Sequence, residues 1–189
     1  MKKWFWLLLL TLCMATSVVS QNLVIKNNLL YDALVTPNLG LELGLGAKTT
    51  LDLTYGLNPF TFQNNEKWKH WSILPEIRLW SCERFNGFFF GAHLLGGEFN
   101  LGGVDIPFKL LPFVKEKRYQ GYFYGGGLSV GYQWPLSNRW NLEASIGGGY
   151  VQFNFNEFLC PYCGPRVDTE TYHYFGPTKA TLSLLYMLY

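Results

Sequence analysis

The sequence lacks any apolar run long enough to cross a bilayer as a helix, and it contains few charged residues. A membrane helix needs about 18 consecutive apolar residues, whereas the most apolar stretch, residues 4–12, is much shorter. Charged residues make up 15% of the chain, and removing Lys2 and Lys3 lowers the formal net charge from +2 to 0. Since a neutral chain offers no electrostatic basis for binding nucleic acid, we expect no nucleic-acid partner.

The N-terminal segment has the features of an export signal. A charged start, Met1-Lys2-Lys3, precedes the apolar stretch, and Val18-Val19-Ser20 offers small residues for cleavage. We expect residues 1–20 to be removed and residues 21–189 to form one domain, a length that suits a single domain. A lipoprotein signal that uses Cys13 is the alternative, but Leu12 is bulky for the position before a lipidated cysteine.

Strict alternation of apolar residues with small or polar residues is the strongest pattern present. It runs through residues 39–46 and recurs at 51–57 and 122–134. A period of two is typical of a strand with one apolar face. Together with the 18% aromatic content and the 20 glycines, the pattern predicts an all-β fold, an eight-stranded antiparallel up-and-down transmembrane β-barrel.

The expected strands cover residues 23–32, 38–47, 50–58, 70–80, 87–96, 120–134, 139–153 and 177–189. Most turns at one end are short, while 59–69, 97–119 and 154–176 form long loops at the other end, as in the bacterial outer membrane. An even strand number places both termini on the periplasmic side, and the terminal Tyr189 resembles an outer-membrane insertion signal.

Some local details stay open or depend on register. Lys26 or Asn27 would face lipid in a regular first strand, so we expect a bulge or a short span there, and the phase of the last strand is undecided. Pro75 has no N–H to donate to a neighbouring strand, which disfavours the strand expected at residues 70–80. A symmetric turn at 135–138 predicts that the glycine triplets at 125–127 and 147–149 lie side by side, 127 opposite 147 and 125 opposite 149. We expect them to relieve crowding, with a smooth patch for a lipid chain or partner as the alternative.

The polar face of the strands predicts a charged interior, and the strand ends predict aromatic girdles. The interior candidates are Glu42, Asp52, Glu76, Arg78, Glu143 and Lys179. We expect them to form an ion-paired plug, because unpaired charges would be costly there, with a narrow proton or ion path as the alternative. The expected interfacial girdles are Trp71, Tyr122 and Tyr150 at the outer end and Trp134 and Trp140 at the periplasmic end.

Cys160-Pro161-Tyr162-Cys163 has the spacing of a thiol redox motif, but it lies in an expected loop rather than at a helix start. We expect Cys160 and Cys163 to form a small structural disulfide in an oxidising compartment, with Cys82 at the opposite end and unpaired. There are two alternatives for these cysteines: they form half of a metal site that His173 completes, or they act as a redox pair. We predict no cofactor and no metal.

Two further groups of residues bear on function. His70 and Ser72 share a side-chain phase at the outer end of a strand, as an acyl-transfer pair would, but no acid can be assigned to them, and His93 is expected to be an interior polar residue. Loop 97–119 carries basic residues beside apolar ones. We expect it to pack its own apolar residues, with contact to lipopolysaccharide or a protein partner as the alternative.

Several segments carry a family resemblance: Asn28–Asp32, Pro37–Glu42, Lys67–Trp71, Cys82–Gly87, Gly131–Trp134 and Tyr174–Lys179. They resemble a family of uncharacterised exported outer-membrane proteins of anaerobic Gram-negative bacteria, a domain of unknown function. The resemblance covers nearly the whole mature chain and implies an OmpA-like barrel, with members often encoded near fimbrial genes. It supplies no catalytic residues.

These observations lead us to expect a non-enzymatic outer-membrane barrel that supports envelope integrity or is associated with fimbriae. The expected partners are outer-membrane lipid and lipopolysaccharide, together with a surface-fibre or envelope protein. The alternatives are an outer-membrane lipid-modifying enzyme and a secreted lipocalin-like carrier. A carrier requires an apolar interior, whereas this interior is predicted to be charged.

Overall fold

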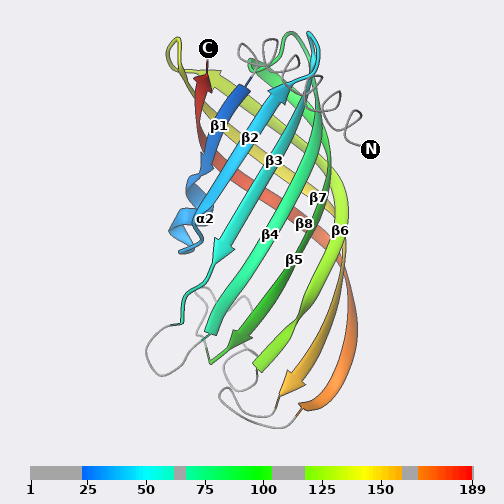
Figure 1. Cartoon of the computed structure of the whole chain (residues 1–189). Helices are drawn as coiled ribbons and strands as arrows, with labels where there is room; N and C mark the ends of the chain where they lie inside the picture. The colour runs from blue at the N-terminus through cyan, green and yellow to red at the C-terminus, as the bar shows by residue number, and fades with distance from the viewer. Residues whose placement is uncertain (1–22, 62–66, 104–117, 159–165, 189) are drawn as a thin grey trace, which may run out of the picture.

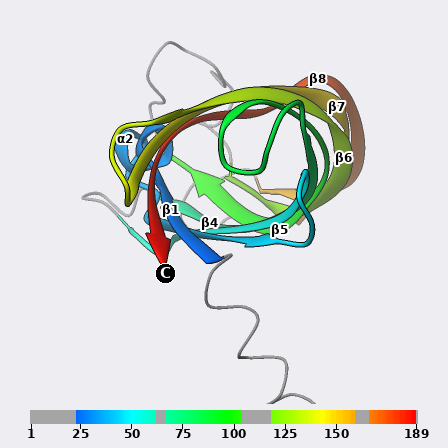
Figure 2. The ribbon, with the colours of Figure 1, turned by 90° about the horizontal axis from the view of Figure 1, so that it is seen from above.

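The alternating segments form strands that pair in chain order until the last strand pairs with the first, which closes a barrel (Figures 1 and 2). This computed structural model describes residues 23–61, 67–103, 118–158 and 166–188. The strands are β1 (Leu23–Asn28), β2 (Asn38–Gly44), β3 (Thr49–Asn58), β4 (Lys67–Trp80), β5 (Gly87–Gly102), β6 (Arg118–Pro135), β7 (Trp140–Phe158) and β8 (Arg166–Leu188), with one short helix, α2 (Leu29–Ala33). The predicted all-β fold of eight antiparallel strands is confirmed.

The two faces of the barrel wall differ in chemistry because successive side chains point to opposite sides. In β3, Leu51, Leu53 and Leu57 are exposed, whereas Asp52 and Asn58, which point to the opposite side, are buried. The same alternation continues through β4 and β5, where Ile77 and Phe90 lie outside and Glu76 lies inside. The apolar face is therefore the outer one, and the barrel buries its polar residues.

The interior is filled in three layers along the barrel. At the turn end an apolar cluster is formed by Val24, Trp80, Phe85, Phe89 and Leu185. The charged residues lie in the middle, where Arg78 stacks on the Phe89 ring with 4.4 Å between the guanidinium carbon and the ring centroid. Towards the loop end, Phe99, Phe123 and Phe153 contact one another at ring-centroid separations of 5.8–6.4 Å.

The last four strands extend much further than the first three (Figure 1). Large parts of segments 97–119 and 154–176, predicted to be loops, are in fact strand: β5 runs to Gly102, β7 to Phe158, and β8 starts at Arg166. In the outer parts of these strands the polarity of the two faces is the reverse of that in the rest of the barrel. Their phenylalanines face inward, and polar residues such as Glu98 and Gln120 are exposed. Because these parts have no apolar outward face, the alternation of apolar with small or polar residues did not predict them as strand.

The first strand is regular and short, with 6 residues, so of the two alternatives expected there the short strand is found and the bulge is not. Lys26 points inward with Val24 and is 4% exposed. The strand ends at Asn28 because its side chain caps α2, accepting a hydrogen bond from the Leu30 amide at 3.1 Å. The same oxygen accepts from the Leu182 amide of β8 at 3.2 Å, so Asn28 also joins the end of β1 to the last strand.

The bulge lies in β8, opposite Gly147 and Gly148. Gly147 faces Lys179 and Gly148 faces Pro177, which leaves Thr178 as an extra residue. Beyond this point the phase of β8 is settled, with Ser183 and Leu185 buried inside and Leu182 outside.

The predicted register of β6 and β7 is wrong by two residues. Gly127 faces Gly149 rather than Gly147, and Gly125 faces Val151. The turn is therefore centred one residue later than expected, and the two glycine triplets overlap at one pair only. Pro75 is accommodated in β4 opposite Leu53.

Some inward glycines provide space for aromatic rings, and one of them gives a testable prediction. A Cβ atom at Gly131 would lie 2.7 Å from the Phe89 ring atom Cε1, and Phe89 is fully buried. We expect Gly131→Val to lower the free energy of unfolding by about 1–3 kcal/mol through overpacking. Gly46→Ala is the control, because nothing lies within 4 Å of a Cβ there. Urea unfolding of both variants in lipid vesicles checks this, and equal midpoints would contradict it.

Candidate functional site

A buried ion cluster occupies the middle of the barrel, and Arg78 lies at its centre. Its guanidinium group donates hydrogen bonds to Glu76 at 2.7 Å, to Glu42 and Glu143 at 2.8 Å, and to Asp52 at 2.9 Å. Arg78 and these four carboxylates are each at most 1% exposed. One cation therefore contacts four acidic side chains that come from four different strands.

The register of the sheet explains why the cluster needs several cations. Glu42 lies directly opposite Asp52, and Asp52 lies directly opposite Glu76, so three carboxylates stand in a row across β2, β3 and β4. Like charges in such positions destabilise a sheet unless they are neutralised. Lys26 contributes from β1, with its Nζ atom 2.9 Å from Asp52 and 3.3 Å from Glu42.

The cluster continues to β8 through Lys179, whose Nζ atom lies 2.6 Å from a Glu76 carboxylate oxygen. The other oxygen of Glu76 accepts a short hydrogen bond from Ser129 and lies 4.0 Å from the His93 ring. His93 also bonds Thr178 through its Nε2 atom at 2.9 Å. Because of the β8 bulge, the adjacent residues Thr178 and Lys179 both reach the interior.

All six interior candidates from the sequence meet in this cluster, and the sequence analysis missed one member, Lys26. The phase of the first strand alone could not assign Lys26, because Lys26 and Asn27 lie on opposite faces. The pairing assigns it, since Val24, on the same face as Lys26, lies opposite the interior Glu42. His93 is interior, as expected, and 3% exposed.

The cluster obstructs the barrel. The free volume beside it is about 10 Å³, bordered by Lys26, Asp52 and Arg78, which is close to the minimum for a single water molecule. With the apolar cluster at the turn end beneath it, this arrangement can hold the wall together but leaves no room for a solute. Chemically, it is a set of ion-paired side chains, three cations against four carboxylates, rather than an open site.

The aromatic girdle residues all lie on the outward face. Trp71, Tyr122 and Tyr150 are on the parts of β4, β6 and β7 nearer the loops, whereas Trp134 and Trp140 flank the turn between β6 and β7. Tyr122 stacks on Tyr124 with 6.4 Å between the ring centroids. The Tyr150 hydroxyl is hydrogen-bonded to His173 of β8.

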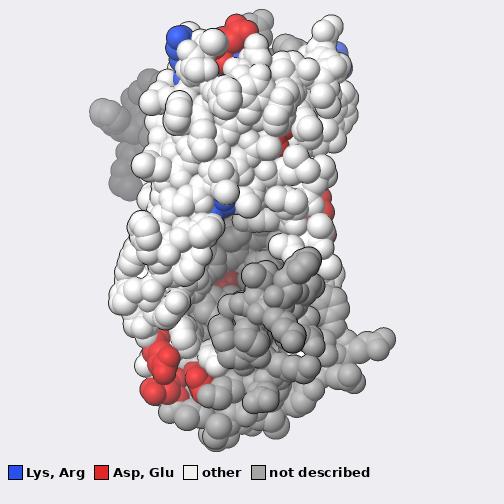
Figure 3. All heavy atoms as spheres, turned by 180° about the vertical axis from the view of Figure 1, so that it is seen from behind, with Lys and Arg blue, Asp and Glu red and all other residues white. Residues whose placement is uncertain are grey.

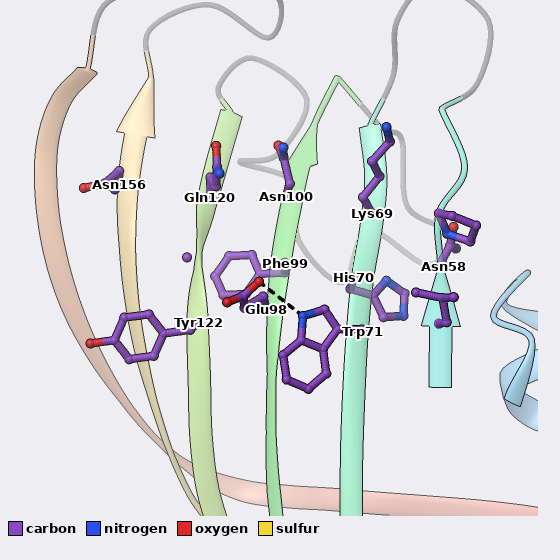
Figure 4. A pocket seen from close by; sticks show the side chains of 13 residues that line it. Asn58, Lys69, His70, Trp71, Glu98, Phe99, Asn100, Gln120, Tyr122 and Asn156 are labelled. Carbon is purple, nitrogen blue, oxygen red and sulfur yellow. Dashed lines mark hydrogen bonds between the residues drawn. The ribbon is translucent and has the colours of Figure 1, made fainter. Parts of the chain in front are cut away.

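A hollow of about 420 Å³ lies at the loop end of β3 to β7 (Figure 4). Trp71 and Glu98 border it on neighbouring strands, and the indole nitrogen donates to the carboxylate at 3.2 Å. Polar side chains form much of the remaining rim, namely Lys69, Asn100, Gln120 and Asn156. The outward surface therefore changes from apolar to polar just beyond the upper aromatic residues.

The remaining candidates do not assemble into a catalytic or metal site among the described residues. His70 bonds Thr36 at 3.3 Å through Nε2 and packs against Trp68. No group of three His, Cys, Asp or Glu side chains suited to a metal ion occurs in the part of the chain that the structure describes. Cys82 is exposed in the turn between β4 and β5.

Several predictions fall outside the described residues: the export signal, the Cys160–Cys163 disulfide and the basic side chains of residues 104–117. Arg118 directly follows residues 104–117. Its guanidinium carbon lies 4.7 Å from the centroid of the Phe158 ring, and its side chain donates a hydrogen bond to Asn100. None of the described helices combines the length and apolarity needed to cross a membrane.

Comparison with known proteins gives a family but no activity. No curated protein and no solved structure matches the chain. One family matches residues 5–188, nearly the whole sequence, and its description is "Protein of unknown function (DUF3575)". The resemblance identified from the sequence is thus confirmed as far as a family of unknown function. The chain belongs to the DUF3575 family.

Proposed function

We propose that this protein is a non-enzymatic barrel of the bacterial outer membrane that anchors a surface-exposed platform in the envelope. The observation that carries the proposal is the ion cluster around Arg78, which fills the lumen. A barrel whose interior is occupied by ion-paired side chains is suited to stability rather than to transport.

The outer surface supports the membrane part of the proposal. Large apolar side chains are exposed on every strand from β2 to β7, including Leu41, Leu53, Ile77, Phe90, Leu128 and Ile146. Such a continuous band is unusual for a protein in water but is what lipid-spanning strands require. Aromatic residues near both ends of the band fit the two interfaces of a bilayer.

The long outer parts of β5 to β8 support the platform. Their outward side chains are polar beyond Trp71 and Tyr122, as illustrated by Asn100, Gln120 and Thr171. These strands extend past the apolar band and would project into the medium outside the cell. Lipopolysaccharide around the barrel and an envelope or surface-fibre protein on the projecting strands are the partners we propose.

The alternatives have less support. A lipocalin-like carrier needs an apolar cavity, whereas the middle of this barrel is occupied by charges. A lipid-modifying enzyme needs an acid beside the histidine and serine, but the described partners of His70 are Thr36 and Trp68.

The plugged interior is tested by conductance. The purified protein, reconstituted in planar bilayers, should show no stable steps of the size that porins give, because the residual space of about 10 Å³ beside the cluster cannot hold a row of waters. A porin of known conductance, inserted in the same bilayers, verifies that channels are detectable. Large and reproducible steps from the protein alone would contradict the plug.

A further inference from the structure

The outward face of β6, β7 and β8 contains a hollow of about 430 Å³ within the apolar band. Leu128, Ile146 and Pro177 form its sides, and Gly148 contributes no side chain to fill it. Leu128 is 72% exposed and Ile146 is 61% exposed, so their side chains project from the outer surface of the sheet. The hollow thus has apolar sides and a glycine in its lining.

A prominent apolar side chain lies directly beside this hollow. Phe175 is 86% exposed, the highest value among the exposed large hydrophobic residues of the described chain. It lies opposite Tyr150 in the β7–β8 ladder, two residues from Pro177, which lies opposite Gly148. Since residues two apart share a face of a strand, Phe175 and Pro177 both point outward, and the protruding ring adjoins the recess.

The β8 bulge causes this arrangement. It directs Thr178 and Lys179 into the lumen, and it reverses the phase of the residues before them so that Phe175 faces outward. The first strand pairs only with residues 183–188 of β8, and no described strand pairs with that edge of residues 168–181.

We propose that this face is a contact between two copies of the chain, in which Phe175 of each copy fills the hollow over Gly148 of the other. The inference rests on the proposed membrane location. A two-fold contact requires that one patch carry both complementary features, and here the ring and the recess are neighbours on two strands. Between membrane-spanning segments, close packing at small residues drives association.

The surroundings suit such a contact. In the view from behind, Lys, Arg, Asp and Glu appear only as a few small patches on the described surface between the two ends of the barrel (Figure 3). The acidic residues Asp168 and Glu170 are exposed further along β8. A lipid chain could also occupy the recess, but it would not depend on Phe175, and this difference separates the two occupants.

The test measures self-association of the full mature protein in phosphatidylcholine vesicles by energy transfer between copies labelled at the N-terminus. We expect Phe175→Ala and Gly148→Leu each to weaken association about tenfold, and the double variant to be little weaker than either, since the two residues act as one contact. Gly148→Leu should fold, because the nearest atom to a Cβ there is 3.5 Å away. Leu94→Ala, an equally lipid-facing change on β5, is the control and should have no effect.

Insertion is measured on the same vesicles by the shift in gel mobility between unheated and heated samples. Protein that is inserted but monomeric, or whose association survives both substitutions unchanged, would overturn the dimer and leave the proposed function intact. Protein that does not insert at all would contradict the proposed function and the dimer together.

Discussion

Replacing Arg78 with alanine should largely abolish the folded barrel. The substitution leaves Glu42, Asp52, Glu76 and Glu143 buried without the cation that contacts all four. Removing one partner from a buried ion pair typically costs about 3–5 kcal/mol, and here the loss affects a row of adjacent carboxylates. Lys26 and Lys179 remain, but neither reaches every acidic group.

The measurement is the folded fraction after refolding into vesicles, together with the urea midpoint of whatever folds. Arg139→Ala is the matched control, since Arg139 is exposed and its side chain donates a hydrogen bond to the Tyr186 hydroxyl at 3.1 Å, outside the ion cluster. It should change stability by about 0.5 kcal/mol or less. Adding Glu143→Gln to Arg78→Ala should restore part of the folded fraction, because one uncompensated charge is removed. An Arg78→Ala protein as stable as the parent would refute the role assigned to the cluster.

An arginine in the apolar band should be the second severe change. Leu94 lies on the outward face of β5, outside the proposed contact between copies, and is 65% exposed, so Leu94→Arg introduces a charge into the region proposed to contact lipid. Near the bilayer midplane such a substitution costs about 2–4 kcal/mol. The result should be a lower urea midpoint and slower insertion, although no contact inside the barrel is touched.

Thr171→Arg provides the comparison. Thr171 is exposed on the same side of the wall, bonds Asn154 at 3.0 Å and lies in the polar outer part of β8. The cost of a charge falls to about 0–1 kcal/mol towards the interface, so this variant should insert like the parent. Equal effects at positions 94 and 171 would show that the band does not face lipid.

The strands with an apolar outward face were predictable because each contains its own alternation of apolar with small or polar residues. The leucines at 39–45 alternate with glycine and glutamate, and β2 follows them closely. Interior charges were also predictable, since Glu42, Asp52, Glu76 and Arg78 occupy the opposite phase. A period of two assigns faces directly, and a charge in such a pattern identifies the inner one.

The rest depended on partners rather than on local pattern. Lys26 could be assigned to the interior only by knowing that β1 lies beside Glu42 and near Asp52. The bulge at Thr178 is fixed by the register between β7 and β8, which a single strand does not encode. In the outer parts of β5 and β7 the polarity of the two faces is reversed, with Phe99 and Phe153 inside, so the rule that apolar residues face outward failed there.

Cell fractionation tests the central claim most directly. Membranes from the native host are separated by density, washed with carbonate, and probed for the mature protein with and without heating before electrophoresis. We predict that the protein stays in the outer-membrane fraction and that unheated samples migrate differently from heated ones, as a folded barrel does. Intact mature protein in the soluble periplasmic fraction, with no change in mobility on heating, would contradict the account.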